Sequence, residues 1–172
     1  MDIFEVKNAL EKNCVLLVDT REQDTMAFRK RLKNIGFPYE RQKLDFGDYS
    51  AKVVAESETI DFSDDFAIER KMSLDELCNC YCKGRKRFEK EFLRAKEKNA
   101  KLYLLIENAD FDKVYNGEYR SLMQPQALIA SIIAWLARYN CQLLFCSAKL
   151  SGNIIKEIIY REVKERLESN VK

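Results

Sequence analysis

Short apolar runs that end in polar or charged residues alternate with longer amphipathic segments in this chain, and this pattern limits the fold most strongly. Four such runs lie at about 14–19, 66–71, 101–108 and 141–147. The last two are apolar at nearly every position, which is typical of parallel strands covered on both faces. The segment 39–55 alternates as two strands on either side of a glycine. The order predicts an α/β domain, a central sheet with helices on both sides.

The segments between the runs have helical spacing and helix-end signals. Gly36 follows a helix expected from Thr25 to Asn34, and Ser73 with Glu76 has capping-box spacing. Another helix is expected after Gly84. Two C-terminal helices are expected within 124–169, the first around the core residue Trp135 and the last striped by Ile154, Ile155, Ile158, Ile159, Val163 and Leu167.

Length and composition predict one globular domain over residues 1–172. The chain is 47% hydrophobic, with 5 Gly and 2 Pro, so the ends and the acidic insert 56–65 are the only segments expected to be loose. It has no signal-peptide pattern and no apolar run near the length of about 18 residues that a membrane span needs. We therefore expect no membrane association and an intracellular location, in the cytoplasm or nucleoid of a prokaryote or phage host, or in a eukaryotic nucleus.

The six cysteines favour reduced thiols over disulfides in such a compartment. Cys78, Cys80 and Cys82 invite a zinc interpretation, but only Cys78 and Cys82 would share a helix face, and a fourth ligand would have to come from a buried strand. Packing in the core is the favoured role. With 0 His in the chain, any hydrolysis must use carboxylates, lysine and metal.

Charge is unevenly distributed behind a formal net charge of +2. The insert 56–65 has five acidic residues and no basic one, whereas 83–98 has eight basic residues and three acidic ones. The second segment is therefore a candidate contact for a polyanion, and we expect Arg85, Arg87 and Lys90 to contact DNA phosphates. The alternative is an ordinary solvent-exposed helix face with Glu/Lys pairs.

Charged residues end two of the strands and precede a third, at 19–22, 47–48 and 69–71. In α/β sheets sites form where strand ends open into loops, so we expect them to meet. Asp48 and Glu69 offer hard oxygen ligands for Mg²⁺ or Mn²⁺, and Lys71 points to the same side of its strand as Glu69. This trio suits phosphodiester hydrolysis, with Asp75 expected to hold the lysine.

These residues also carry a family resemblance. "VDTRE" (18–22), "GDY" (47–49) and "ERKMSLD" (69–75) resemble the nuclease domain of the XPF-type structure-specific endonucleases, whose signature is Gly-Asp followed by Glu-Arg-Lys-x-x-x-Asp. "KGRKRFEKE" (83–91) is similar to that family's Gly-Arg segment up to Arg85. The likeness spans about residues 14–108.

The resemblance implies a restriction-endonuclease-like three-layer domain, with a central mixed sheet between helices. It implies a Mg²⁺- or Mn²⁺-dependent endonuclease that cuts DNA at branches, flaps or junctions. Asp48 and Glu69 match the metal ligands and Lys71 the catalytic lysine. The supporting positions are Asp19, Arg21, Glu22, Arg70 and Asp75.

The resemblance also bears on the partners of the chain and on alternative functions. We expect a homodimer, because such nucleases pair through this domain and the C-terminal helices have spare apolar surface. The sequence shows no tandem helix-hairpin-helix module and no helicase domain, so a separate DNA-targeting or helicase subunit is an expected partner. The rivals are a non-catalytic DNA-binding or scaffolding subunit, a Holliday-junction or restriction-type nuclease of the same fold, and a plain interaction domain.

Overall fold

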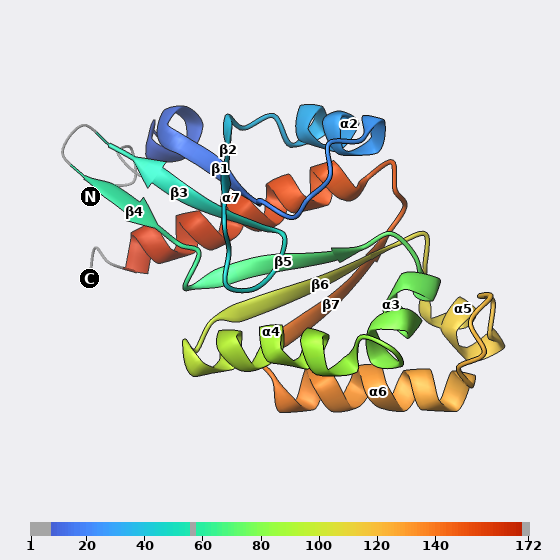
Figure 1. Ribbon diagram of the computed structural model, residues 1–172. Coiled ribbons are helices and arrows are strands. Elements are labelled where there is room, and N and C mark those ends of the chain that lie inside the picture. Colours follow the sequence, from blue (N-terminus) through green and yellow to red (C-terminus); the bar gives the residue numbers. More distant parts are fainter. Residues whose placement is uncertain (1–7, 56–57, 170–172) are drawn as a thin grey trace.

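The computed structural model describes residues 8–55 and 58–169, and its strands form a 7-stranded mixed sheet (Figure 1). The order is β2-β1-β3-β5-β6-β7, with β4 paired to β3 off this path. The strands are β1 (Cys14–Asp19), β2 (Tyr39–Gln42), β3 (Tyr49–Val54), β4 (Thr59–Asp61), β5 (Phe66–Lys71), β6 (Lys101–Glu107) and β7 (Cys141–Cys146). The predicted α/β fold with a central mixed sheet is confirmed.

Helices cover both faces of the sheet. They are the π-helix η1 (Ala9–Asn13) and the α-helices α2 (Met26–Ile35), α3 (Leu74–Tyr81), α4 (Arg85–Glu97), α5 (Phe111–Asn116), α6 (Pro125–Arg138) and α7 (Ser151–Ser169). The long α7 crosses behind the strands in Figure 1, whereas α3, α4 and α6 lie together below them. No helix within residues 8–55 and 58–169 is long and apolar enough to cross a membrane.

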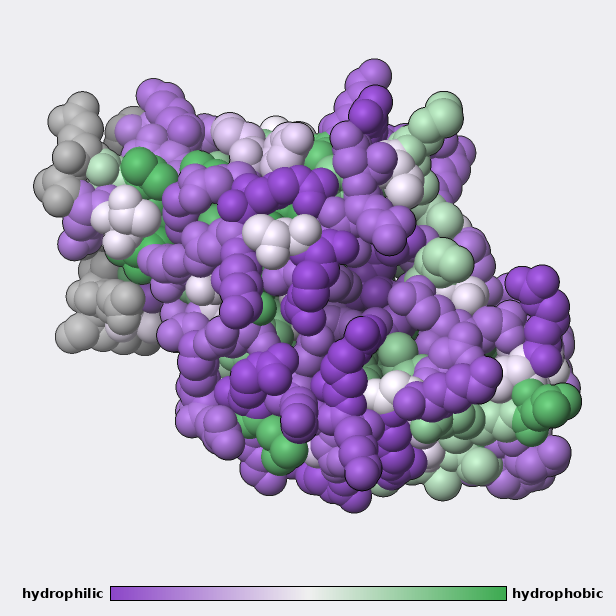
Figure 2. Space-filling view, viewed as in Figure 1, coloured by the Kyte–Doolittle hydropathy of each residue, from purple (hydrophilic) through white to green (hydrophobic). Residues whose placement is uncertain are grey.

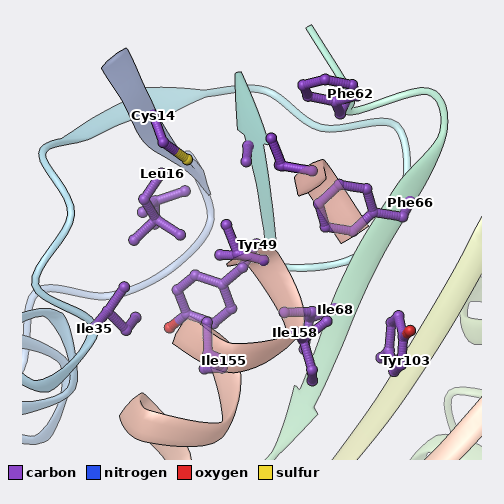
Figure 3. Close-up of a cluster of buried hydrophobic side chains, with 14 of the residues drawn as sticks. Cys14, Leu16, Ile35, Tyr49, Phe62, Phe66, Ile68, Tyr103, Ile155 and Ile158 are labelled. Carbon is purple, nitrogen blue, oxygen red and sulfur yellow. The ribbon is translucent and has the colours of Figure 1, made fainter. Parts of the chain in front are cut away.

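Two apolar cores hold these layers together. On the α2 and α7 side, Leu16, Tyr49 and Ile68 from the sheet pack against Ile155 and Ile158 of α7 (Figure 3). On the other side, α3, α4 and α6 surround an aromatic cluster. Its centre is Trp135, only 1% exposed, which confirms the expected core position.

The strand directions bring three chain segments to one edge of the sheet. Strand β3 runs antiparallel to both β1 and β5, so its start lies beside their ends. The Asp19 amide donates to the Asp48 carbonyl, and the Asp48 amide donates to the Ile68 carbonyl, each at 2.8 Å. Gly47 makes this approach possible, since it has φ +72° and a Cβ there would lie 2.7 Å from Ala67 Cβ. The predicted meeting of the three segments is confirmed.

Helix ends agree with the sequence, while some short elements were not predicted. Ser73 Oγ accepts from the Glu76 amide, as the capping box requires, and Gly36 ends α2 in the left-handed conformation. The insert 56–65 is more ordered than expected: its residues 59–61 form β4, while residues 56–57 lie outside the described ones. Helices η1 and α5 were not predicted from the sequence either. All six cysteines are free.

Candidate active site

A cleft of about 490 Å³ opens at the edge where β1, β3 and β5 meet. The surface around it in Figure 2 is mostly hydrophilic. Seven of the residues singled out from the sequence line this cleft: Arg21, Glu22, Asp48, Glu69, Arg70, Lys71 and Arg87. The strand-end pattern therefore identified most of a single site.

Asp48 and Glu69 are the two carboxylates at the centre of the cleft. Asp48 Oδ2 accepts from the Arg70 amide at 2.8 Å, which fixes the carboxylate against the end of β5. Burial raises the pKa of Asp48 well above its ordinary value, and the nearby charge of Glu69 raises it further. Burial likewise raises the pKa of Glu69 to about 7, against an attraction from Lys71 that lowers it. The positive charge near these two carboxylates is therefore too small to offset the effect of their burial.

Lys71 lies beside these carboxylates on the same strand. Its Nζ is hydrogen-bonded to Glu69 Oε1, lies 4.0 Å from Glu76 Oε1, and lies 5.0 Å from the centre of the Phe88 ring. Burial lowers the pKa of Lys71, but the charges of Glu69 and Asp48 more than offset this and hold it above its ordinary value. Beside the metal-free carboxylates, Lys71 is consequently an ammonium donor.

Arg21 connects the end of β1 to α4. Its Nε donates to Asp19 Oδ1 at 2.6 Å, and its Nη1 donates to Glu91 Oε1 at 2.8 Å. Asp19 is fully buried and also accepts from the Leu44 amide at 2.8 Å, so it does not line the cleft. The role of Asp19 is to orient Arg21 and the loop that follows β1.

Glu22 is held by two residues that the sequence analysis did not single out. Tyr49 Oη donates to Glu22 Oε2 at 2.6 Å, and Arg31 Nη1 lies 3.7 Å from the same oxygen. Arg31 also donates to Tyr49 Oη at 3.0 Å. Burial raises the pKa of Tyr49, so its hydroxyl remains a donor. Arg31 lies on α2 and carries no motif signal, whereas Tyr49 was quoted in "GDY" without a role.

Arg70 makes a two-point ion pair with Glu107 at the end of β6. Its Nε and Nη2 donate to the two carboxylate oxygens at 2.7 and 2.8 Å. Burial raises the pKa of Glu107, but its bonds to Arg70 outweigh this effect and lower it. Arg70, one of the supporting positions that the resemblance implies, therefore holds a carboxylate at the end of β6. Glu107 was missed, although it ends an apolar run just as Glu69-Arg70-Lys71 does.

Asp75 does not hold Lys71, so that prediction is wrong. Its Oδ1 accepts from the amides of Arg120 at 2.8 Å and Ser121 at 2.9 Å, and Oδ2 lies 3.7 Å from Arg120 Nε. The physical reason is that α3 turns Asp75 toward the loop before α6, while Glu69 and Glu76 are the carboxylates that reach the lysine. Asp75 instead anchors that loop.

The three residues predicted to contact DNA all lie exposed on α4. Arg87 lines the cleft itself. Arg85 and Lys90 are not among the cleft residues, so the structure places them beside the site rather than in it.

The cleft offers the right donors for a hard divalent cation. Asp48 and Glu69 supply carboxylate oxygens, with Glu22 and Glu91 lining the same cleft, and the raised pKa values show that extra positive charge would be favourable there. Among residues 8–55 and 58–169, no three acidic, Cys or His side chains are already grouped as a metal site. Mg²⁺ and Mn²⁺ are hard cations of this kind, and they are commonly held by one or two carboxylates together with waters and substrate phosphate.

Comparisons with known proteins agree with this geometry. The model of a family described as the ERCC4 domain matches residues 18–158. Among solved structures, XPF from Aeropyrum pernix is similar with a TM-score of 0.60 and 20% identity, covering 86% of this chain and 61% of that one. The same protein in complex with DNA matches with a TM-score of 0.60 and 20% identity over 88% of this chain and 66% of that one. No curated protein matches in sequence. The chain thus spans less than two thirds of these relatives, and the likeness establishes their shared fold.

Proposed function

The chain belongs to the ERCC4 domain family, and from this premise we propose that it is a divalent-metal-dependent endonuclease that hydrolyses DNA phosphodiester bonds. The observation that carries the proposal is the meeting of Asp48, Glu69 and Lys71 in one cleft at a sheet edge. A non-catalytic scaffold would not need the buried Glu69 and the half-buried Asp48, both with raised pKa, beside one ammonium, because that arrangement costs stability.

The residues of the chain have separate roles in this proposal. Asp48 and Glu69 would hold Mg²⁺ or Mn²⁺, which when bound neutralises phosphate oxygens and acidifies a water. The Lys71 ammonium donates hydrogen bonds to a phosphate oxygen or to the attacking water, and its raised pKa keeps it charged through neutral pH. Arg31 and Tyr49 hold Glu22 at the cleft wall, where its free carboxylate oxygen can orient a water.

The substrate we propose is DNA with a branch, flap or junction. The support is family membership, together with the similar structure of an XPF protein in complex with DNA. A separate DNA-targeting or helicase partner is also part of the proposal.

We also propose that the chain pairs with a second copy through the end of the molecule formed by α5 and α6. The apolar stripe of the last helix, α7, is not available, since Ile155, Ile159 and Val163 are fully buried. Instead, large apolar side chains are exposed on and between α5 and α6: Phe111, Tyr115, Leu122 and Ile133. Figure 2 shows hydrophobic residues at this end. An exposed apolar patch of this kind is typical of a protein interface.

Sedimentation tests the pairing. We expect about twice the monomer mass of 20.2 kDa at micromolar concentration, and the monomer mass for Leu122→Arg, whose side chain is 96% exposed and so can change without loss of core packing. A monomer mass for the wild type would contradict the dimer.

Incubation with labelled DNA tests the activity. The purified protein is mixed with flap, fork, duplex and single-stranded DNAs of shared sequence, in Mg²⁺, Mn²⁺ or EDTA. We expect internal cleavage of a branched DNA with either metal and none in EDTA. Absence of cleavage in all DNAs with both metals, by a protein that is folded, would contradict the proposed function.

A further inference from the structure

Two further hollows adjoin the catalytic cleft, one on each side. The first, of about 350 Å³, is lined by Thr20, Arg21, Lys43, Leu44, Asp45 and Arg94, and we name it the Lys43 groove. The second, of about 500 Å³, includes Lys71, Lys83 and Arg87 among its lining residues, and we name it the Lys83 groove.

The cleft shares walls with both grooves. Arg21 lines the cleft and the Lys43 groove, whereas Lys71 and Arg87 line the cleft and the Lys83 groove. The two grooves share no lining residue with each other. The three hollows are therefore consecutive, with the catalytic cleft in the middle.

The three hollows follow one another along helix α4. Arg87, Glu91 and Arg94 are spaced by four and three residues, so they lie along one face of the helix. Arg87 lines the Lys83 groove and the cleft, Glu91 the cleft, and Arg94 the Lys43 groove. With a rise of about 1.5 Å per residue, Arg87 and Arg94 are about 10 Å apart along the axis. That span corresponds to about three base-pair steps of about 3.4 Å along the axis of a DNA duplex.

The charge of the three hollows differs. The cleft is balanced: its bases are Arg21, Arg31, Arg70, Lys71 and Arg87, and its acids are Glu22, Asp48, Glu69, Glu76 and Glu91. The Lys43 groove has three basic residues and one acid, Asp45, which is itself paired with Lys98 at 2.7 Å. The Lys83 groove has three basic residues and one acid, Glu76. Arg21, Lys71, Arg87 and Glu76 are shared with the cleft, but the charged residues that line one groove only are still mainly basic: Lys43 and Arg94 against the paired Asp45 in the first, and Lys83 alone in the second. Positive charge is therefore in excess on both sides of a neutral centre.

We propose that the strand to be cut lies along α4, with its phosphates held by the Lys43 groove on one side of the scissile bond and by the Lys83 groove on the other. This inference rests on the proposed nuclease function and deepens it. A polyanionic strand matches two cationic grooves separated by a neutral cleft, because its flanking phosphates gain charge partners while the central phosphate is left to the catalytic groups. The arrangement favours an internal phosphodiester, since a bond at a strand end would fill only one groove.

Charge reversal of one lysine in each groove tests the binding. Lys43→Glu and Lys83→Glu alter exposed residues that belong to neither the carboxylates nor the catalytic lysine, and Lys156→Glu on α7 is the matched control on the other face. Affinity for a fluorescent forked DNA is measured without divalent metal at several salt concentrations. Each groove variant should bind at least about fivefold more weakly, with a salt slope reduced by about 0.7 to 0.9, and the double variant should show both losses.

Uncharged linkages in the DNA backbone test which groove holds the phosphates on each side of the scissile bond. Methylphosphonates replace the phosphates on one side of the mapped cut, and single-turnover cleavage is compared among the variants. Neutralising one side should make one lysine variant indistinguishable from the wild type, and neutralising the other side should do the same for the other variant. If a wild type that binds does not cut, the proposed function fails, while the salt slopes still decide whether both grooves hold DNA. The inference is overturned if either groove variant behaves as Lys156→Glu does, or if both lysines respond to the same side.

Discussion

Opposite edges of the same sheet each contain a buried carboxylate cluster, but the two clusters are satisfied to different degrees. At the edge away from the cleft, Glu162 of α7 accepts from Lys101 at 2.7 Å and from Tyr103, and lies 3.0 Å from Arg166. Burial raises the pKa of Glu162, but the bonds to Lys101 and Tyr103 outweigh it and lower the pKa. In the cleft, Asp48 and Glu69 share one lysine, and burial keeps their pKa values raised.

The difference separates a carboxylate with several cationic partners from two carboxylates that share one. A buried carboxylate with enough cationic partners stabilises the fold in its charged form, whereas buried carboxylates in excess over cations destabilise it unless a further cation binds. The cleft carboxylates therefore lower the stability of the fold, whereas Glu162 at the opposite edge contributes to it. The following predictions, in order of decreasing effect, test this contrast.

Glu69→Gln should have the largest effect. Removing a carboxylate that would hold the metal should reduce cleavage on the order of 10³-fold. DNA affinity without metal should change little, and the melting temperature should not fall, because a carboxylate in excess over cations is removed. Single-turnover cleavage of a forked DNA in Mn²⁺ measures the loss, with the exposed Asp112→Asn on α5 as the control. A Glu69→Gln protein that cuts at the rate of the wild type would refute the proposed role of Glu69 in holding the metal.

Lys71→Met should slow cleavage by about 100-fold, because one hydrogen-bond donor to the developing charge is lost. Because the ordinary lysine pKa of 10.5 lies well above this range and a phosphate beside Lys71 favours its charged form, the wild-type rate should not fall between pH 7 and pH 9 through loss of this proton. A pH profile of the single-turnover rate checks this point. A decline in that interval that is absent from Lys71→Met would show that the lysine deprotonates.

Glu162→Gln should reduce stability and leave cleavage unchanged. Loss of the charged partner of Lys101 and Arg166 should cost about 2 kcal/mol of unfolding free energy at pH 7. The folded pKa of Glu162 lies below its ordinary value of 4.5, so its contribution is present above that pH and is lost as pH falls through the folded pKa. Urea unfolding at pH 7 and pH 4 measures the effect, with the exposed Glu165→Gln as the control. An equal loss in both variants would show that the network is not structural.

Asp75→Ala should have the smallest effect. It leaves the Arg120 and Ser121 amides without their acceptor but does not touch Lys71, so we expect about 1 kcal/mol less stability and less than about tenfold slower cleavage. The same urea and cleavage assays apply. A loss as large as that of Lys71→Met would restore Asp75 to the catalytic group.

The sequence predicted the centre of the site better than its surroundings. Asp48, Glu69 and Lys71 could be placed together because strand ends meet at sheet edges, a rule that needs only local pattern. Arg31, Tyr49, Glu91 and Glu107 were missed as partners because their contacts join elements far apart in the chain, as in the Arg21–Glu91 pair, 70 residues apart. The error on Asp75 has a similar origin, since helical spacing alone does not tell which neighbour a side chain faces.

The short helices and strands were the part of the fold that the apolar pattern of the sequence could not predict. Strand β4 has three residues within an acidic insert, so its pairing with β3 in the register Val53 to Ile60 depends on the tertiary structure rather than on its own propensity. The five-residue η1 and the six-residue α5 are likewise too short to show a periodic apolar pattern. The longer helices and the apolar strands carried that pattern and were predicted.

Calorimetric titration of Mn²⁺ tests the proposal that the cleft carboxylates are in excess over cations because they bind a metal ion. The wild type, Asp48→Asn and Glu162→Gln are titrated in the absence of DNA. The account predicts that the wild type and Glu162→Gln bind Mn²⁺ alike and that Asp48→Asn binds at least about tenfold more weakly. Equal binding by Asp48→Asn and the wild type would contradict it.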